Sequence, residues 1–293
     1  MAFALLKPAY HDVYPFVDPT NNLKGAAAGK SVLVTGAGTG IGVSIAECFA
    51  LAGASTVILA ARRTEKLEAT KAGIADLAPD CKVIVVGTDV ANRQSVEKLF
   101  ESLDHVPDVI VSNAAASRDE PIIDSNPDVW WNQVDVNIRG PYLIARSYLR
   151  AARAAGKKGG RIINVSSNGA WRVFPGLSAY SASKSGLDTF TEHLDVECVK
   201  DGSGMRSVAM HPGGVVTEMA SAPHVPDAIR KLLIDKPALA GSTAVYLSTE
   251  RADFLMGRFV NATWDMEALE GVKERVLEED LLRTRVIGLV GGS

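Results

Sequence analysis

Seven short apolar segments recur along the chain from residue 30 onward, each six or seven residues long. In these segments the apolar residues run on continuously and do not alternate with polar ones. Continuous apolar runs of this length are typical of strands that are covered on both faces of a sheet. The segments are 31–36, 55–61, 82–87, 108–113, 161–167, 206–212 and 257–262.

The residues between these segments show a helical period. Ile41, Ile45 and Phe49 recur at every fourth position, which places them on one face of a helix. Strands that alternate with helices predict right-handed crossovers and a parallel sheet. The sequence therefore predicts an α/β fold: a single doubly wound Rossmann-type domain, with about seven parallel strands and helices on both faces. The expected helices are 41–52, 64–77, 92–103, 127–155 and 178–200.

The two ends of the chain lie outside this alternating pattern. Residues 1–29 are expected to be an N-terminal extension whose YPFVDP segment lies extended across the surface, and residues 30–262 to be the main domain. Residues 263–293 are expected to be a C-terminal helical extension. Within it, 264–285 are predicted to form one amphipathic helix that packs through Met266, Leu269, Val272, Val276 and Leu277 on its own domain or on a neighbour.

Composition excludes several classes of protein. The 293 residues carry a net charge of −3, which gives no basic surface for nucleic acid. The apolar run at the N-terminus is too short for a signal peptide, and no segment is long enough to span a membrane, so we expect a cytoplasmic location. Cys48, Cys81 and Cys198 lack the spacing of a metal or disulfide framework and are predicted to be buried thiols. The histidines show no metal-binding spacing either, so no metal site is predicted.

A glycine-rich turn, TGAGTGIG, joins the first apolar segment to the first predicted helix. Gly36, Gly38, Gly40 and Gly42 allow a tight turn and a close approach to the backbone. The N-terminus of the following helix offers free N–H groups to a pyrophosphate. In this strand–turn–helix setting, the motif predicts a dinucleotide-binding site rather than a purely structural turn.

The end of the second apolar segment indicates which dinucleotide binds. An acidic residue about 20 positions beyond the glycines would bind the 2′-hydroxyl of NAD, but here Ala61 is followed by Arg62 and Arg63. A guanidinium group suits the 2′-phosphate of NADP. We therefore expect NADP(H) to be favoured over NAD(H). The alternative is that both arginines are solvated at the start of a helix.

Tyr180 and Lys184 are separated only by Ser, Ala and Ser. If residues 178–200 are helical, these two side chains lie one turn apart and point the same way, and the small residues leave room for another molecule. The alternative is a surface tyrosine that stacks on the lysine stem.

Taken together, the motifs resemble the short-chain dehydrogenase/reductase family. The resemblance extends from about residue 30 to about residue 262, and the motifs follow the family's order. The N-terminal YPF segment and the ending GRFVNATWDMEAL are similar to those of fungal members tied to specialised metabolism. The motifs are TGAGTGIG, Asp89-Val90, SNAA (112–115), Asn137, Ser167, YSASK (180–184) and HPGGVVT (211–217).

The resemblance implies a catalytic set and a reaction. Tyr180 would be the acid–base group and Ser167 would hold the substrate oxygen. Lys184 would lower the pKa of Tyr180 and bind the nicotinamide ribose, and Asn137 would order a water that links the lysine to solvent. The reaction would be hydride transfer between NADP(H) and a small-molecule ketone or secondary alcohol.

The resemblance also implies further binding residues. Asp89 and Val90 would flank the adenine, Asn113 would steady the fourth strand, and Val215 and Thr217 would meet the nicotinamide carboxamide. The expected cofactor contacts are completed by Gly36, Gly38, Thr39, Gly40, Ile41, Ala114, Ala115, Pro212 and Gly213.

Substrate choice is expected to depend on Ser167, Trp171, Phe174 and Met219, with a mobile lid at about 217–236. The alternative for the aromatic residues is a place in the core or at a subunit interface. A partly aromatic or polycyclic ketone or alcohol from specialised metabolism is the expected substrate. Predicted helices 127–155 and 178–200 resemble the family's dimer faces, so a homodimer or homotetramer is expected.

Two other functions remain open on the same scaffold. One is a non-redox enzyme, such as a dehydratase, epimerase or cyclase. The other is a binding protein that senses NADP(H) without chemistry, although such a sensor would not need Asn137, Ser167, Tyr180 and Lys184.

Overall fold

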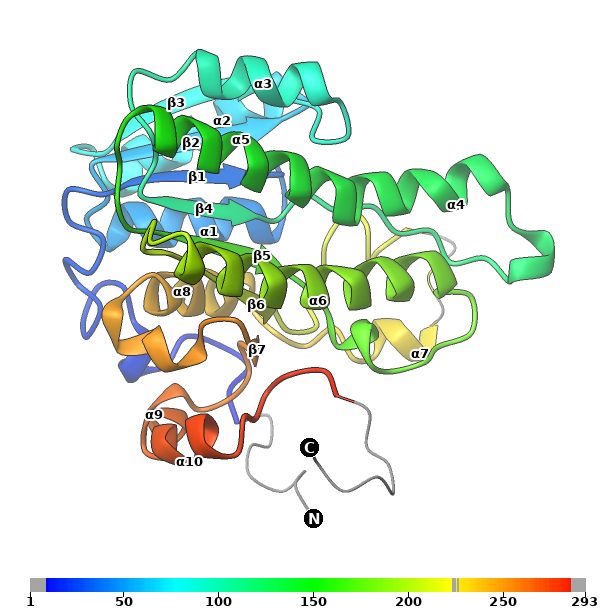
Figure 1. The fold of residues 1–293 in the computed structure, drawn as a ribbon. Helices are drawn as coiled ribbons and strands as arrows, with labels where there is room; N and C mark the ends of the chain where they lie inside the picture. Colours follow the sequence, from blue (N-terminus) through cyan, green and yellow to red (C-terminus); the bar gives the residue numbers. More distant parts are fainter. Residues whose placement is uncertain (1–8, 223–224, 226, 286–293) are drawn as a thin grey trace.

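The computed structural model describes residues 9–222, 225 and 227–285. Its centre is a seven-stranded parallel sheet in the order β3-β2-β1-β4-β5-β6-β7. All seven predicted strands are present, which confirms the doubly wound α/β fold (Figure 1). The strands are β1 (Ser31–Thr35), β2 (Thr56–Ala61), β3 (Lys82–Gly87), β4 (Val109–Ser112), β5 (Gly160–Val165), β6 (Met205–His211) and β7 (Phe259–Asn261).

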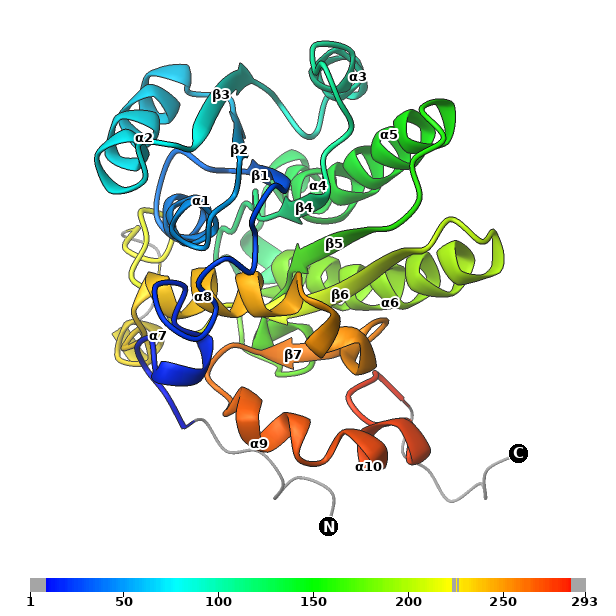
Figure 2. The same ribbon diagram turned by 90° about the vertical axis from the view of Figure 1, so that its left-hand side faces the viewer.

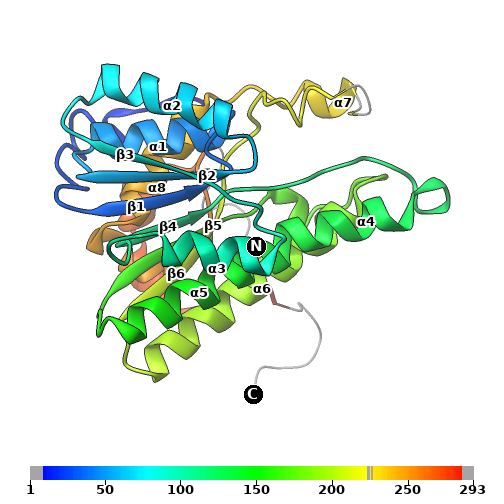
Figure 3. The same cartoon turned by 90° about the horizontal axis from the view of Figure 1, so that it is seen from above.

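Helices cover both faces of the sheet. Viewed from above, α1 (Ile41–Leu51), α2 (Thr64–Leu77) and α8 (Pro237–Leu247) lie on one face (Figure 3). The other face carries α3 (Arg93–Glu101), α4 (Pro127–Val134), α5 (Gly140–Ala154) and α6 (Ser178–Lys200). The shorter helices are α7 (Asp227–Arg230), α9 (Met266–Glu270) and α10 (Lys273–Glu278).

The two faces explain why the strands are apolar throughout. On β1, Val32 and Val34 belong to the cluster of buried residues under α1 and α8, whereas Leu33 belongs to the cluster under α5. Ile58 of β2 lies in the second cluster as well. Successive side chains of a strand point to opposite faces of the sheet. When helices cover both faces, the side chains on each face must be apolar, so the whole strand is apolar.

The segment predicted as one helix over 127–155 is interrupted. A π-helical turn, Asp135–Arg139, separates α4 from α5, and Asn137 lies within it. This turn widens the helix next to the carboxyl ends of the strands. π-helical turns inside α-helices often occur at functional sites.

The N-terminal extension differs from the expected extended path. Pro15–Val17 form a 3-10 turn, and Tyr14 and Val17 are buried in the core. The extension lies beside α8 and close to α9 (Figure 2). Apolar side chains at these positions explain the difference, because burying them removes their surface from water.

The C-terminal segment contains two short helices where one was predicted. α9 ends before Gly271, and Leu277 is exposed on α10, while Met266, Leu269 and Val276 pack into the protein's own core. Cys81 is also only partly buried, because it directly precedes the outermost strand β3, whereas Cys48 and Cys198 are buried as predicted.

Candidate active site

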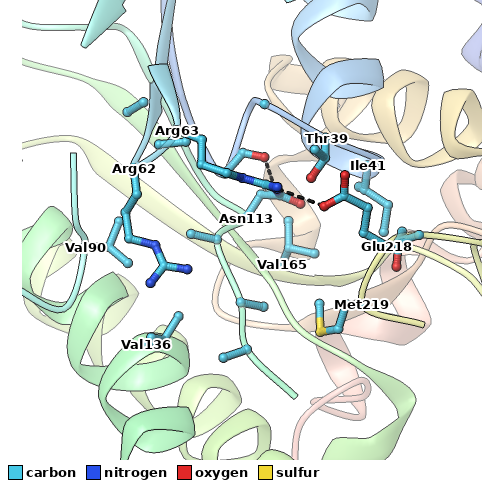
Figure 4. A pocket seen from close by; sticks show the side chains of 18 of the residues that line it. Thr39, Ile41, Arg62, Arg63, Val90, Asn113, Val136, Val165, Glu218 and Met219 are labelled. Carbon is cyan, nitrogen blue, oxygen red and sulfur yellow. Dashed lines mark hydrogen bonds and ion pairs between the residues drawn. The ribbon is translucent and has the colours of Figure 1, made fainter. Parts of the chain in front are cut away.

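One cavity of about 310 Å³ lies at the carboxyl ends of the central strands. Its walls include the turn after β1, the end of β2 and the end of β4 (Figure 4). The first turns of α6 also line it, through Tyr180 and Lys184. In an open parallel sheet this position, where the strand order reverses between β1 and β4, is the usual ligand site.

The glycine turn is shaped for a close approach of chain or ligand. A Cβ at Gly42 would lie 2.3 Å from the carbonyl oxygen of Gly36, and one at Gly36 would lie 2.9 Å from Cα of Ala114. Gly36 and Gly40 have positive φ, which glycine adopts readily. Among the described residues, no side chain caps the N-terminus of α1 at Gly40, so the first N–H groups of this helix are available to an anion. These features fit a dinucleotide pyrophosphate.

Asn113 ties β4 to the glycine turn. Its amide nitrogen donates to the carbonyl oxygens of Thr35 at 2.9 Å and Gly36 at 3.4 Å, and the hydroxyl of Thr35 accepts from its backbone N–H at 3.0 Å. These bonds hold two cavity walls, the ends of β1 and β4, in a fixed relation.

Tyr180 and Lys184 lie in the first and second turns of α6, which form one wall of the cavity. The Lys184 ammonium lies 5.7 Å from the centre of the Tyr180 ring and donates to the carbonyl oxygen of Val165 at 2.6 Å. Gly169, which lies between Ser167 and Tyr180, would bring a Cβ within 3.5 Å of the tyrosine ring and 3.4 Å of the Ser167 hydroxyl. The tyrosine, serine and lysine are therefore neighbours.

The pKa of Tyr180 differs from the sequence expectation. Burial raises the pKa of Tyr180, the hydrogen bond with Ser167 lowers it, and the nearby Asp119 raises it. The lowering of this pKa that was expected from Lys184 is not among these effects; the ammonium lies 5.7 Å from the ring centre and donates to the Val165 carbonyl.

Lys184 has a buried acidic neighbour that sequence reasoning missed. Asp188 lies one turn further along α6 and is buried. Burial lowers the pKa of Lys184, and Asp188 opposes that change. Burial also raises the pKa of the Asp188 carboxyl, while the Ser166 hydroxyl and Lys184 lower it. The spacing of four residues on one helix was the available signal.

Asn137 holds the loop after β4 in place. Its side-chain oxygen accepts from the Ala116 N–H at 2.8 Å, and its nitrogen donates to the Ala116 carbonyl at 2.8 Å and to the Ser183 hydroxyl at 3.1 Å. Asn137 thereby links the π-helical turn, the cavity wall and α6.

His211 supports the segment that carries Ser167. Its Nδ1 accepts from the Asn168 N–H at 3.2 Å, and burial lowers the pKa of His211 to about 3. A neutral ring of this kind orients the turn after β5.

The structure brings most of the predicted cofactor residues together in the cavity wall. Gly40, Gly213 and Val215 belong to the same loops but do not line the cavity. The residues that do line it are Gly36, Gly38, Thr39, Ile41, Arg62, Arg63, Asp89, Val90, Asn113, Ala114, Ala115, Tyr180, Lys184, Pro212 and Thr217.

Of the four predicted substrate residues, Met219 lines the cavity, and Ser167, Trp171 and Phe174 are not among its described lining residues. The Trp171 ring packs edge-on against Phe259, whose ring also meets Trp264. Trp171 is nevertheless 45% exposed, so it does not lie in the core, and a substrate contact and a subunit interface both stay open for it.

The cavity also contains residues that sequence reasoning missed. Lys66 lies in the first turn of α2, four residues after Arg62, and Glu218 directly follows Thr217, so their spacing could have indicated both. Ser166, Asn132 and Val136 reach the cavity only because the fold brings their segments together. The others are Ala60, Ala61, Thr88, Ala116 and Val165.

The fold and this site together define a dinucleotide-binding α/β protein. A family model described as short chain dehydrogenase matches residues 30–224. The chain is 34% identical over 298 residues to the short chain dehydrogenase mpl6 of Monascus purpureus, covering 97% of each chain. It is 34% identical over 287 residues to the short chain dehydrogenase pigC of Monascus ruber, covering 95% of this chain and 92% of that one.

A solved structure shows the same architecture. It is an NAD(P)-dependent dehydrogenase from Beutenbergia cavernae with NADP bound at low occupancy, and it matches with a TM-score of 0.72 and 28% identity, covering 81% of this chain and 96% of that one. The protein therefore belongs to the short-chain dehydrogenase/reductase family and is an oxidoreductase. Members of this family bind NAD(P) and act on small molecules. In the described part of the chain, no helix is long and apolar enough to cross a membrane.

Proposed function

We propose that the protein is an NADP(H)-dependent oxidoreductase that interconverts a ketone and a secondary alcohol. The observation that carries the proposal is that Tyr180 and Lys184 line the same cavity as the glycine turn and Arg62. A dinucleotide that lies on the glycine turn can therefore reach both the basic end of β2 and the tyrosine.

In the proposed reaction, bound NADPH supplies a hydride to the carbonyl carbon of the substrate. The Tyr180 hydroxyl donates a proton to the carbonyl oxygen, and the products are the alcohol and NADP⁺. Ser167 holds the same oxygen by a hydrogen bond, and Lys184 binds the ribose hydroxyls and holds positive charge beside the phenol. Asn137 orients the π-helical turn behind the lysine and orders the water of the proton path.

The basic residues at the end of β2 support NADP(H) over NAD(H). Arg62, Arg63 and Lys66 line one wall of the cavity. An anionic 2′-phosphate binds well to guanidinium and ammonium groups. Asp89 also lines this region, but Oδ1 of its carboxylate accepts from the Ala91 N–H at 3.0 Å and so stabilises the loop that contains both residues.

The substrate is proposed to be a ketone or alcohol of specialised metabolism, in keeping with the resemblance to fungal members. Met219 would contact it from the proposed lid at about 217–236, with Trp171 and Phe174 further out. A homodimer or homotetramer and a cytoplasmic location stay predictions from the sequence.

The experiment that tests this function follows absorbance at 340 nm with NADPH and a panel of ketones and quinones. Tyr180→Phe should reduce turnover by about 10²- to 10⁴-fold while NADPH binding is retained. Equal turnover in the variant would contradict the catalytic role of Tyr180, and turnover with NADH alone would contradict the cofactor preference. A product of unchanged redox state, formed without cofactor turnover, would favour the dehydratase, epimerase or cyclase alternative.

A further inference from the structure

An ion pair joins two walls of the cavity. Arg63 follows β2, and Glu218 lies in the segment after β6. Nη2 of Arg63 donates to Oε2 of Glu218 at 2.8 Å, and both residues line the cavity (Figure 4). Their side chains are about half exposed, at 54% and 56%, so the pair lies at the mouth of the cavity.

The Glu218 side of this pair adjoins the glycine turn. A Cβ at Gly40 would lie 3.0 Å from Cγ2 of Thr217, the residue before Glu218. The ion pair therefore connects the end of β2, where the adenosine ribose is expected, with a segment that touches the pyrophosphate turn.

The two arginines at the end of β2 are not equivalent. Arg63 reaches across to Glu218, whereas Arg62 extends toward Val90 and Val136 (Figure 4). Within the described ranges, Arg62 makes no hydrogen bond or ion pair that would occupy its guanidinium group. A 2′-phosphate therefore meets one available arginine and one that already holds a carboxylate.

We propose that Glu218 competes with the 2′-phosphate of the cofactor for Arg63, so that Glu218 is a determinant of cofactor preference. The inference rests on the proposed NADP(H) dependence. A phosphate dianion with three acceptor oxygens binds a guanidinium more strongly than one carboxylate does, so it displaces Glu218 at some cost in affinity. A cofactor without the 2′-phosphate leaves the ion pair in place and does not bear this cost.

The experiment measures binding of 2′,5′-ADP and 5′-AMP by calorimetry, because these probes differ only in the 2′-phosphate. In Glu218→Gln, binding of 2′,5′-ADP should tighten by about two- to fivefold, the range expected from releasing an exposed ion pair. Binding of 5′-AMP should not change. The matched control is Glu65→Gln, which removes an exposed charge from the first turn of α2 near Arg63 without breaking the 2.8 Å contact.

A second variant shows whether the gain depends on Arg63. In Arg63→Ala/Glu218→Gln, 2′,5′-ADP should bind no more tightly than in Arg63→Ala alone. If Glu218→Gln still tightens 2′,5′-ADP binding when Arg63 is absent, or if Glu65→Gln tightens it by the same factor, the proposed competition for Arg63 is wrong.

The remaining outcomes separate this inference from the proposed function. If the wild type prefers 2′,5′-ADP and Glu218→Gln leaves that preference unchanged, the competition is wrong and the NADP(H) proposal stands. If neither protein prefers 2′,5′-ADP over 5′-AMP, both are wrong. Urea unfolding with the same midpoint as the wild type shows, independently of nucleotide binding, that each variant is folded.

Discussion

Lys184 and Asp188 lie one turn apart on the same face of α6, and both are buried. A buried carboxyl beside a buried ammonium can act on catalysis through the lysine, and it also affects folding. Because burial raises the pKa of Asp188, the folded protein binds a proton there at pH values where the unfolded chain has released it.

Asp188→Asn should therefore change how stability depends on pH. In the wild type, this carboxyl opposes folding increasingly as the pH rises from about 4 to about 7, and it has no such effect at lower pH. The difference in free energy of unfolding between the variant and the wild type should therefore increase in favour of the variant as the pH rises over that range. The increase should be at least about 1.4 kcal/mol, which corresponds to one pKa unit. Urea unfolding at pH 4.5 and pH 7.5 measures this.

The control is Asp76→Asn, which removes an exposed carboxyl from α2. Its stability relative to wild type should be the same at both pH values. An equal pH response in the two variants would show that Asp188 is not held in a special environment.

Ser167→Ala should shift the pH profile of alcohol oxidation to higher pH. Tyr180 must be ionised to accept the substrate proton, and the hydrogen bond with Ser167 lowers the pKa of that phenol. When this hydrogen bond is lost, the effect of burial raises the pKa of Tyr180 further, so the rising limb of kcat/KM shifts to higher pH. The rate should also fall about 10²- to 10³-fold, because a donor to the substrate oxygen is lost.

The measurement is a pH–rate profile with a secondary alcohol and NADP⁺. Ser181→Ala is the control, because Ser181 adjoins Tyr180 on α6 and its hydroxyl has no partner among the described residues. A rising limb that stays at the wild-type pH in Ser167→Ala would argue that the two side chains do not interact during turnover.

Gly42→Ala should destabilise the protein and weaken nucleotide binding. The new Cβ would lie 2.3 Å from the Gly36 oxygen and 2.6 Å from the Asn113 amide nitrogen, so the glycine turn must shift. Overpacking of this kind costs about 1–3 kcal/mol. Urea unfolding and calorimetry with NADPH measure the two effects.

Gly73→Ala provides the opposite case. Gly73 lies inside α2, and within the part of the chain that the structure describes a Cβ at this position would meet only Glu47, at 3.8 Å. An alanine there should raise stability by about 1 kcal/mol, because glycine is the poorer helix former. Equal losses in both variants would mean that the close contacts at Gly42 do not decide its effect.

The sequence predicted the sheet well because burial on both faces leaves a continuous apolar signal. α8 gave no comparable signal. It is buried all round, so it lacks the apolar stripe by which a surface helix is recognised. The break in the C-terminal segment was missed because the apolar spacing continues across Gly271, and the spacing alone does not show where the helix ends.

The candidate site could be predicted where motifs follow strands directly, as at Gly36 and Arg62. Site residues that come together only in the folded protein, from segments far apart in the sequence, were harder to predict. Glu218 faces Arg63 across 155 residues of chain, and no local pattern records that contact. The direction of the Tyr180 pKa shift was missed for a related reason, because it depends on where the Lys184 ammonium points and on how deeply the phenol is buried.

Tyr14→Phe should weaken the contact between the two ends of the chain. The Tyr14 hydroxyl accepts from the buried Met266 N–H at 2.7 Å, and the Asp265 carboxylate accepts from the next two N–H groups of α9. Tyr14 thus completes the cap of this short helix from the N-terminal extension. Removing the hydroxyl leaves a buried donor without a partner, which costs about 1–3 kcal/mol.

Tyr10→Phe is the matched control, because Tyr10 and Tyr14 stack with ring centres 3.6 Å apart and phenylalanine preserves that stack in either variant. The Tyr10 hydroxyl reaches Asp265 only at 3.5 Å, so its loss should cost less than about 0.5 kcal/mol. Urea unfolding compares the two. A Tyr14→Phe protein as stable as Tyr10→Phe would show that the Met266 amide finds another partner, and that the extension is held by its apolar side chains alone.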